Sequence, residues 1–167
     1  MDTLMRKHGL PPLVDAHTEI LILGSLPSDE SLVKEQYYAK PTNDFWKLVG
    51  AALHEPLTDA SCPERIQILF KHKVGLWDVL HSCVRPGSMD QNISETELND
   101  FSILKNIAPN LKLICLNGKK AAEAEEQIRT LGYKTEILPS SSGANRAHQI
   151  ERLRCWTECL CPQLMPL

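Results

Sequence analysis

The sequence predicts a single three-layer α/β/α domain with a mostly parallel central sheet. Three short apolar runs, residues 19–23, 111–116 and 135–138, have the length and composition of strands covered on both faces. Segments with helical spacing of apolar residues separate these runs, and strands that alternate with helices are typical of a parallel sheet flanked by helices. A chain of 167 residues is long enough for one well-buried core.

Residues 1–18 are polar and broken by prolines, and we expect an N-terminal arm packed on one domain that spans residues 19–167. Although 43% of the residues are hydrophobic, they form no long uncharged run, so we expect no membrane span. The first ten residues carry charges and lack the apolar region of a signal peptide, which favours a cytoplasmic protein. We expect the chain to be a monomer.

The first strand, residues 19–23, ends in the turn Gly24-Ser25-Leu26-Pro27, and a short helix over residues 31–36 follows. Pro41 disfavours helix just before it. The next helix is therefore expected to begin near Asn43 or Asp44, where an asparagine suits the N-cap. That helix buries Phe45, Trp46, Val49 and Leu53.

The middle of the chain predicts mixed elements. A helix with proline in its first turn begins at Ser61, residues 74–80 predict a strand or extended segment, and residues 82–94 predict a loop. Residues 95–108 have the spacing of a helix that turns four apolar side chains inward: Leu98, Phe101, Leu104 and Ile107. After the strand at 111–116, residues 119–131 predict a further helix, which Gly132 ends.

The last strand runs into Pro139-Ser140-Ser141-Ser142-Gly143-Ala144-Asn145-Arg146, and a helix with apolar residues at Ile150, Leu153, Trp156 and Leu160 follows. Such a turn can present backbone N–H groups and hydroxyls to an anion. Gly143 permits a close backbone approach, and Arg146 stands where a cation reaches a phosphate. Because ligands bind beyond the carboxyl ends of parallel strands, we place the site where Gly24 and Pro139 converge.

Charge and cysteine content narrow the function classes. A net charge of −3 argues against coating nucleic acid by bulk electrostatics, yet it allows a local basic face. The six cysteines contain no CxxC pair, and three of them form the pattern Cys155-x3-Cys159-x-Cys161, in which Cys155 and Cys159 fit ordinary helix packing. We therefore expect free buried thiols, no metal and no cofactor.

Taken together, five motifs resemble the uracil-DNA glycosylase superfamily, most closely its hypoxanthine-DNA (deoxyinosine) glycosylase branch. They occur in the family's order and span residues 19–156. The motifs are Gly24-Ser25-Leu26-Pro27, Tyr37-Tyr38-x-x-Pro41-x-Asn43-Asp44-Phe45-Trp46, Gly75-Leu76-Trp77-Asp78, Asn117-Gly118-Lys119, and Pro139 through Arg146.

The resemblance implies a role for each matching residue. The mismatch-specific uracil glycosylases carry their catalytic Asn where this chain has Leu26. The hypoxanthine branch lacks that Asn too, and its implied catalytic residue is the Asn before the Phe-Trp pair, which is Asn43 in this chain. The implied base pocket comprises Gly24, Ser25, Leu26, Pro27, Tyr38 and Phe45. The implied contacts with DNA phosphates, and the insertion into the duplex, fall to Ser140, Ser141, Ser142, Gly143, Ala144, Asn145 and Arg146. Ser28 replaces the glycine of many relatives and adds bulk near the pocket.

The implied reaction is base-excision repair of DNA that contains a deaminated base. The nucleotide flips out of the duplex, and hydrolysis of its N-glycosidic bond leaves an abasic site. Asn43 can orient water through its carbonyl oxygen or donate its amide to the leaving base. Asp29, Asp44 and Asp78 are weaker candidates for activating water. No lysine stands out as a Schiff-base nucleophile, so we expect a monofunctional enzyme.

Alternatives remain open at this level. Hypoxanthine or uracil can be the substrate. The same strand-end turns would serve a non-catalytic, flavodoxin-like module that binds a nucleotide or phosphate. A serine hydrolase using one of Ser140, Ser141 or Ser142 with His148 is disfavoured, because the G-x-S-x-G elbow is missing.

Overall fold

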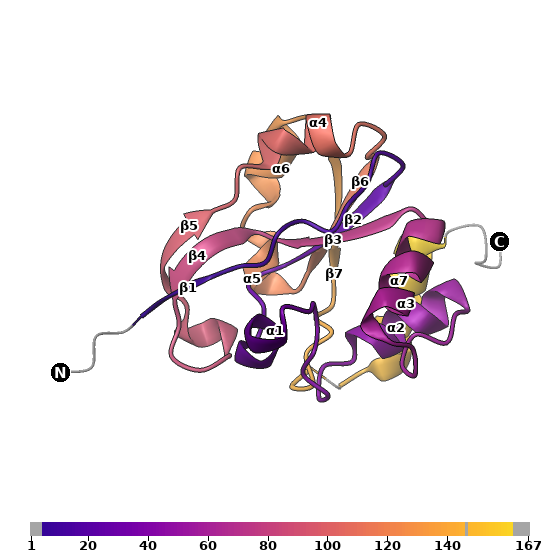
Figure 1. Cartoon of the computed structure of the whole chain (residues 1–167), viewed down its shortest axis with the longest axis horizontal. Coiled ribbons are helices and arrows are strands. Elements are labelled where there is room, and N and C mark those ends of the chain that lie inside the picture. The colour runs from indigo at the N-terminus through magenta and orange to yellow at the C-terminus, as the bar shows by residue number, and fades with distance from the viewer. Residues whose placement is uncertain (1–4, 146, 162–167) are drawn as a thin grey trace.

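The computed structural model describes residues 5–145 and 147–161. Within these residues, a four-stranded parallel sheet of order β3-β2-β6-β7 forms the centre of the molecule (Figure 1). Its strands are β2 (Ile20–Gly24), β3 (Val74–Asp78), β6 (Leu113–Asn117) and β7 (Lys134–Leu138). Because all of them run in the same direction, with Gly24 opposite Asp78 and Asn117 opposite Leu138, their carboxyl ends lie at one edge.

Helices cover both faces of this sheet. Alternate side chains of a strand point to opposite faces, so Ile22 and Cys115 pack into one core while Leu21 and Ile114 pack into the other. The first core lies under α2 (Phe45–Leu53), α3 (Cys62–Lys71) and α7 (Gln149–Leu160). The second lies under α4 (Leu104–Ile107), α5 (Lys119–Ala122) and α6 (Glu125–Thr130). The predicted three-layer fold is confirmed.

A second, antiparallel sheet was not predicted. In the described part of the chain it contains β1 (Arg6–His8), β4 (Leu80–Val84) and β5 (Ser94–Leu98), in the order β1-β4-β5. Through β1, the expected N-terminal arm adds a strand to β4. Between β4 and β5 lies a loop that contains a short helix, η1 (Asp90–Asn92).

Two predictions for this region were wrong. The expected loop over 82–94 begins in β4, and the expected helix over 95–108 begins in β5, whose side chains are all exposed. The helical turns start later, at η2 (Phe101–Ile103), where Asp100 caps the chain by accepting from the Ser102 N–H. Phe101 and Leu104 are buried as predicted, whereas Leu98 is exposed, because only the second half of the apolar pattern is helical.

The helix α2 buries Phe45, Trp46, Val49 and Leu53, which confirms that prediction. The last helix, α7, departs from its predicted face at its first turn. Ile150 is 88% exposed, while Arg152 points inward one turn before the buried Trp156. A short helix, α1 (Asp29–Lys34), follows the turn after β2, and Ser28 caps it by accepting from the Ser31 N–H.

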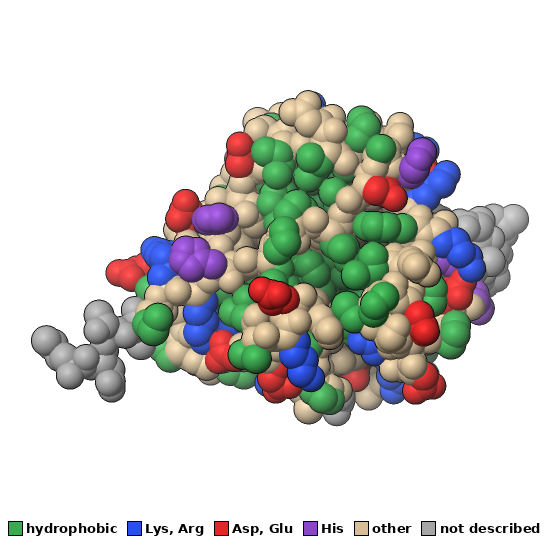
Figure 2. Space-filling model, in the orientation of Figure 1, with side chains coloured by type: hydrophobic (Ala, Val, Ile, Leu, Met, Phe, Trp, Pro, Cys, Tyr) green, Lys and Arg blue, Asp and Glu red, His purple; other side chains and the backbone are tan. Residues whose placement is uncertain are grey.

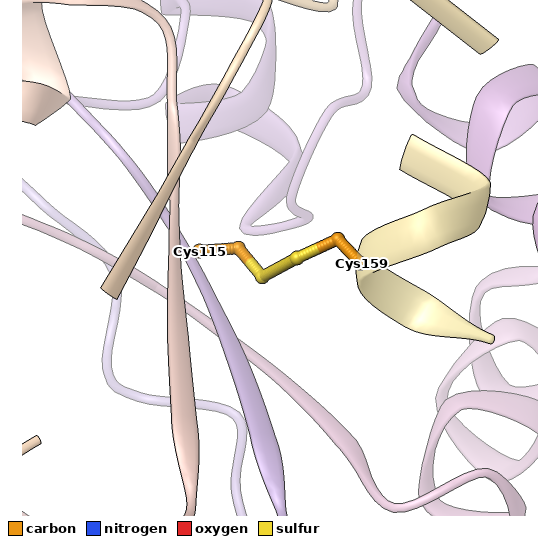
Figure 3. The surroundings of a disulfide bond; sticks show 2 residues. All are labelled: Cys115 and Cys159. Carbon is orange, nitrogen blue, oxygen red and sulfur yellow. A yellow bond between two sulfur atoms is a disulfide. The ribbon is translucent and has the colours of Figure 1, made fainter. Parts of the chain in front are cut away.

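A disulfide joins Cys115 of β6 to Cys159 of α7 (Figure 3). The expectation of free thiols was therefore wrong for this pair, although Cys62, Cys83 and Cys155 are free. Among the described residues, no three His, Cys, Asp or Glu side chains gather where they could hold a metal ion. The same residues contain no helix that is long and apolar enough to span a membrane.

The surface carries mixed charge. On the face shown in Figure 2, apolar side chains gather over the middle of the molecule, and acidic and basic side chains alternate around its rim. This mixture agrees with a net charge of −3 and places no large field of one sign on this face.

Candidate active site

A cavity of about 480 Å³ lies at the carboxyl edge of the parallel sheet, between the turn after β2 and the loop after β7. We call residues 139–145, which follow β7, the serine loop (Figure 1). The rest of the wall comes from Ser31 of α1, the chain from Tyr37 to Asn43, the ends of β3 and β6, and residues 88–91. Segments far apart in the sequence thus converge at the carboxyl edge of the sheet, where the sequence predicted the site.

Asn43 lines the cavity, and its oxygen is already committed to the protein. Oδ1 accepts hydrogen bonds from the Phe45 backbone N–H at 2.9 Å and from the Ser141 hydroxyl at 2.8 Å. Because only an oxygen can accept from a backbone N–H, this contact fixes the orientation of the amide. The Nδ2 group makes no hydrogen bond within the described residues. What Asn43 can offer a ligand is therefore a pair of donors.

Ser141 holds Asn43 in place. Its hydroxyl accepts from Asn117 Nδ2 at 2.9 Å and donates to Asn43 Oδ1, which gives the chain of hydrogen bonds one direction. The Ser141 N–H donates to Asn117 Oδ1, and its carbonyl accepts from the Asp44 N–H. Because its hydroxyl both accepts and donates a hydrogen bond and only 1% of its surface is exposed, Ser141 has a structural role: it positions Asn43.

Tyr38 forms an aromatic wall of the cavity. Its ring stacks on Phe45 with centroids 3.7 Å apart and planes 7° from parallel, and its hydroxyl accepts from Asn117 Nδ2. Burial raises the pKa of Tyr38, so the phenol stays neutral. Phe45 is completely buried and lies behind Tyr38, outside the cavity lining. Tyr38 is thus the ring of this pair that faces a ligand.

Gly24 and Asp78 form the floor at the ends of β2 and β3. A Cβ on Gly24 would lie 2.6 Å from Asp78 Oδ1 and 2.9 Å from the Tyr38 hydroxyl, so only glycine fits. The Asp78 side chain accepts a hydrogen bond from the Gly24 backbone. Burial, together with the negative charge of Asp90, raises the pKa of Asp78 to about 7.

Residues 88–91 form a wall that the sequence did not predict. Ser25 donates to Asp90 Oδ1 at 2.7 Å and joins the turn after β2 to this segment. Arg85, only 1% exposed, donates to the carbonyls of Leu26, Pro27 and Gly87. This one guanidinium fixes the pocket turn against the loop after β4.

Arg152 of α7 holds the serine loop in place, as Arg85 holds the turn after β2. Its Nη1 donates to the carbonyls of Ser140 at 3.2 Å and Asn145 at 2.9 Å, and its Nη2 pairs with Asp44 Oδ2 at 2.6 Å. Asp44 directly follows Asn43, so Arg152 links the start of α2 to the loop. A charged residue one turn before the buried Trp156 was the signal available in the sequence.

The serine loop uses most of its own donors. The N–H groups of Ser141, Ser142, Ala144 and Asn145 all bond within the protein, so the expected row of free backbone donors for an anion was wrong. A Cβ on Gly143 would overlap the Thr42 carbonyl oxygen, which confirms the close approach expected there. The predicted site residue Arg146 lies outside the described residues.

The other candidate carboxylates are engaged. Asp29 pairs with Lys7 at 2.6 Å and with Arg85 at 3.4 Å, and Asp44 pairs with Arg152. His148 is exposed, and the Ser141 hydroxyl donates to Asn43 instead of to an imidazole. This geometry weighs against the serine hydrolase.

Comparison with known proteins decides the family. A sequence model described as the uracil DNA glycosylase superfamily matches residues 11–161. The chain belongs to the uracil-DNA glycosylase superfamily. The resemblance inferred from the five motifs is thereby confirmed.

Within the superfamily, the chain is similar to two archaeal proteins named hypoxanthine DNA glycosylase. One, from Methanosarcina acetivorans, is 52% identical over 152 residues, which cover 91% of this chain and 96% of that protein. The other, from Methanosarcina barkeri, is 51% identical over 154 residues, covering 92% and 98%. A solution NMR structure of a candidate uracil DNA glycosylase from M. acetivorans matches with a TM-score of 0.86 at 51% identity, covering 93% of this chain and 97% of that one.

Proposed function

We propose that this protein is a monofunctional DNA glycosylase that removes hypoxanthine from deoxyinosine in DNA and leaves an abasic site for base-excision repair. Family membership and the two relatives named for hypoxanthine support this assignment. The observation that carries it is Asn43, whose oxygen is fixed by the protein while its amide donors are left for a ligand in the cavity.

The cavity suits an extruded base. A volume of about 480 Å³ falls within the usual range for small-molecule sites, and its wall combines the Tyr38 ring with the Asn43 amide. A base in a duplex is out of reach, so the nucleotide must flip out at a cost of a few kcal/mol, which is lowest for a damaged base. Stacking against Tyr38 offsets part of that cost.

The chemistry follows from the donors. As the C1′–N9 bond breaks, its electron pair leaves with the purine, and negative charge develops on the base. The Asn43 Nδ2 donors stabilise that charge, an effect worth roughly 3–4 kcal/mol for a well-placed donor. Water then adds to C1′ and releases a proton to solvent. Because its oxygen is engaged by the Phe45 N–H and the Ser141 hydroxyl, Asn43 acts on the leaving base and not on the water.

DNA is the proposed partner, held through the serine loop from Ser140 to Asn145 and through Arg146. The loop borders the cavity, and Arg152 fixes it relative to Asn43. A rigid loop beside the pocket suits a role in filling the space that the extruded base leaves. We further propose that the protein acts as a monomer in the cytoplasm, as its sequence predicts.

Labelled duplexes with one deoxyinosine or one deoxyuridine test the proposal, with alkali used to break abasic sites. Asn43→Ala is compared with Asn110→Ala, because the Asn110 side chain likewise bonds to the backbone, by donating to the Ala16 carbonyl, but lies outside the cavity lining. We expect cleavage at deoxyinosine by the wild type and by Asn110→Ala, and none by Asn43→Ala. Cleavage at uracil alone would overturn the assignment of hypoxanthine as the substrate. Binding of the duplexes without cleavage at deoxyinosine or deoxyuridine would favour the non-catalytic module.

A further inference from the structure

Asp78 is a carboxyl group on the cavity floor that the mechanism above does not use. It ends β3 directly beside Gly24 and is 3% exposed. One oxygen, Oδ2, is buried and has no hydrogen-bond partner among the described residues. Because a buried, unpaired carboxylate is costly, this group needs either a proton or a ligand.

The charges around Asp78 disfavour its ionised form. Asp90, on the loop after β4, faces it with a like charge. The cation nearby is Arg85, whose guanidinium donates to the carbonyls of Leu26, Pro27 and Gly87 and to Asp29. The Tyr38 hydroxyl also lies beside Asp78, whereas the Tyr37 hydroxyl donates to the carbonyls of Leu10 and Pro11. Burial keeps both phenols neutral by raising their pKa values. The Gly24 backbone supplies a single hydrogen bond.

Gly24 allows the Asp78 carboxyl group and the Tyr38 hydroxyl to approach each other on the cavity floor. The position that a Cβ would occupy lies 2.6 Å from Asp78 Oδ1 and 2.9 Å from the Tyr38 hydroxyl. Both side chains therefore pack closely against Gly24, and Asp78 and Tyr38 line the same cavity, where a base that stacks on Tyr38 would lie beside the carboxyl group.

We propose that Asp78 works as a neutral carboxylic acid that donates a hydrogen bond to the extruded base and stabilises it as it leaves. This inference rests on the proposed function. Hypoxanthine carries the acceptors O6 and N7 and, beside O6, the donor N1–H. A protonated carboxyl can donate to an acceptor and accept from N1–H, whereas a carboxylate would repel O6 and N7.

The hydrogen bond from Asp78 stabilises the leaving base more than it stabilises the intact nucleotide. The electron pair of the broken C1′–N9 bond moves onto the base, so a donor binds more strongly as the bond breaks, and a carboxylate would oppose it. The proton stays on Asp78 throughout. A carboxylic acid kept neutral by an apolar site is an established way of placing such a donor.

The proposal fixes the direction of the pH dependence. Burial, followed by the charge of Asp90, raises the pKa of Asp78 to about 7, so the donor is present below that pH and is lost above it. The rate of base release should therefore fall with rising pH, by roughly tenfold from about pH 8 to about pH 9. An asparagine at this position donates at every pH.

The test is single-turnover release of hypoxanthine, with enzyme saturating over a deoxyinosine duplex, at a series of pH values. Wild type is compared with Asp78→Asn, Asp78→Ala and, as the matched control, Asp59→Asn at an exposed position. We expect wild type and Asp59→Asn to lose activity above pH 7. Asp78→Asn should retain at least about a tenth of the rate at low pH and lose the alkaline fall, whereas Asp78→Ala should lose roughly 100-fold.

A wild-type rate that is flat or rises through pH 7, or an alkaline fall that persists in Asp78→Asn, would overturn the proposal. A carboxyl ¹³C NMR titration of the free protein, assigned with Asp78→Asn, supplies a readout besides activity. Ionisation of Asp78 at its ordinary pKa would also overturn it. Release of hypoxanthine by the wild type at low pH tests the proposed function separately, so the two failures are distinguishable.

Discussion

Asn43 combines a structural and a chemical duty in one side chain. Its oxygen accepts from the Phe45 N–H at the start of α2 and from the Ser141 hydroxyl, while its nitrogen is left for the ligand. The N-cap of α2 is Asp44, so the N-cap position that the sequence indicates lies one residue after Asn43. The structural contacts of Asn43 and the catalytic role implied by the family are compatible, because they use opposite ends of the amide.

Replacing Asn43 by aspartate separates the two duties. An aspartate retains the oxygen that accepts from Phe45 and Ser141, so these two hydrogen bonds remain, but it loses both donors and adds a negative charge. We expect Asn43→Asp to fold normally and to lose about 100- to 1,000-fold in single-turnover excision. Circular dichroism with excision kinetics checks this, and activity within a few-fold of wild type would remove the donors from the mechanism.

Asp78 should also affect stability, in a direction set by its raised pKa. The unfolded chain ionises this residue near its ordinary pKa of about 3.9, whereas the folded protein keeps the proton up to about pH 7. The folded state therefore binds more protons in this window, and the group's contribution to stability falls as pH rises, by at most about 1.4 kcal/mol per pH unit.

Asp78→Asn removes that dependence. Denaturant unfolding at about pH 5 and about pH 8 should show the variant gaining stability relative to wild type by a few kcal/mol at the higher pH. Asp59→Asn, at an exposed position, is the control and should follow the wild type. A constant difference between wild type and Asp78→Asn across this range would contradict a raised pKa.

Among the elements, α7 does most to assemble the site. Arg152 reaches from it to the serine loop and to Asp44, and Trp156 donates to the Pro139 carbonyl at the start of the loop. Removing Arg152 would leave the loop carbonyls and the Asp44 carboxylate buried without their hydrogen-bond partner, and unpaired buried polar groups lower the free energy of unfolding.

We expect Arg152→Gln to lower the free energy of unfolding by about 3–5 kcal/mol and to weaken DNA binding, because it releases the serine loop. The control is Arg154→Gln on the same helix, whose exposed side chain pairs with neighbouring glutamates of α7. That variant should change stability by less than about 1 kcal/mol. Chemical denaturation and a DNA titration measure both effects, and equal behaviour of the two variants would contradict the assigned role.

The disulfide is the second link between α7 and the sheet. It spans 44 residues, so closing this loop in the unfolded chain should stabilise the protein by roughly 2–4 kcal/mol. We expect Cys159→Ser to lose that amount under non-reducing conditions and Cys155→Ser to lose much less. If a reducing agent leaves the unfolding transition of the wild type unchanged, the bond does not contribute.

Local patterns predicted the elements whose core faces are continuous. The runs at β2 and β6, and the face of α2, follow from apolar spacing alone. The strand β7 forms where it was predicted, but the expectation that it is buried was wrong, because it lies at the edge of the sheet and only Leu138 is buried. β5 was missed because Ser94–Leu98 has no buried face, and its pairing with β4 comes from distant residues. The first turn of α7 was misread because Arg152, and not Ile150, turns inward to satisfy loop carbonyls.

At the scale of the whole molecule, the position of the site followed from topology. Parallel strands bring their carboxyl ends to one edge, so Gly24, Asn117 and the serine loop had to converge. The wall at residues 88–91 could not be predicted, since it depends on Arg85 bonding to carbonyls nearly 60 residues earlier in the chain. The order of the motifs was enough to predict the chemistry of the site, whereas the cavity wall at residues 88–91 depends on long-range packing that the sequence does not reveal.

The most direct test of the account is whether the wild-type protein releases free hypoxanthine from a duplex with one deoxyinosine. Mass spectrometry of the supernatant measures the free base, and alkali cleavage of the same sample counts abasic sites. We expect the two amounts to be equal, to exceed the enzyme over several turnovers, and to form at least about 100-fold more slowly with Asn43→Asp. A folded protein that binds this duplex and releases no base would contradict the account.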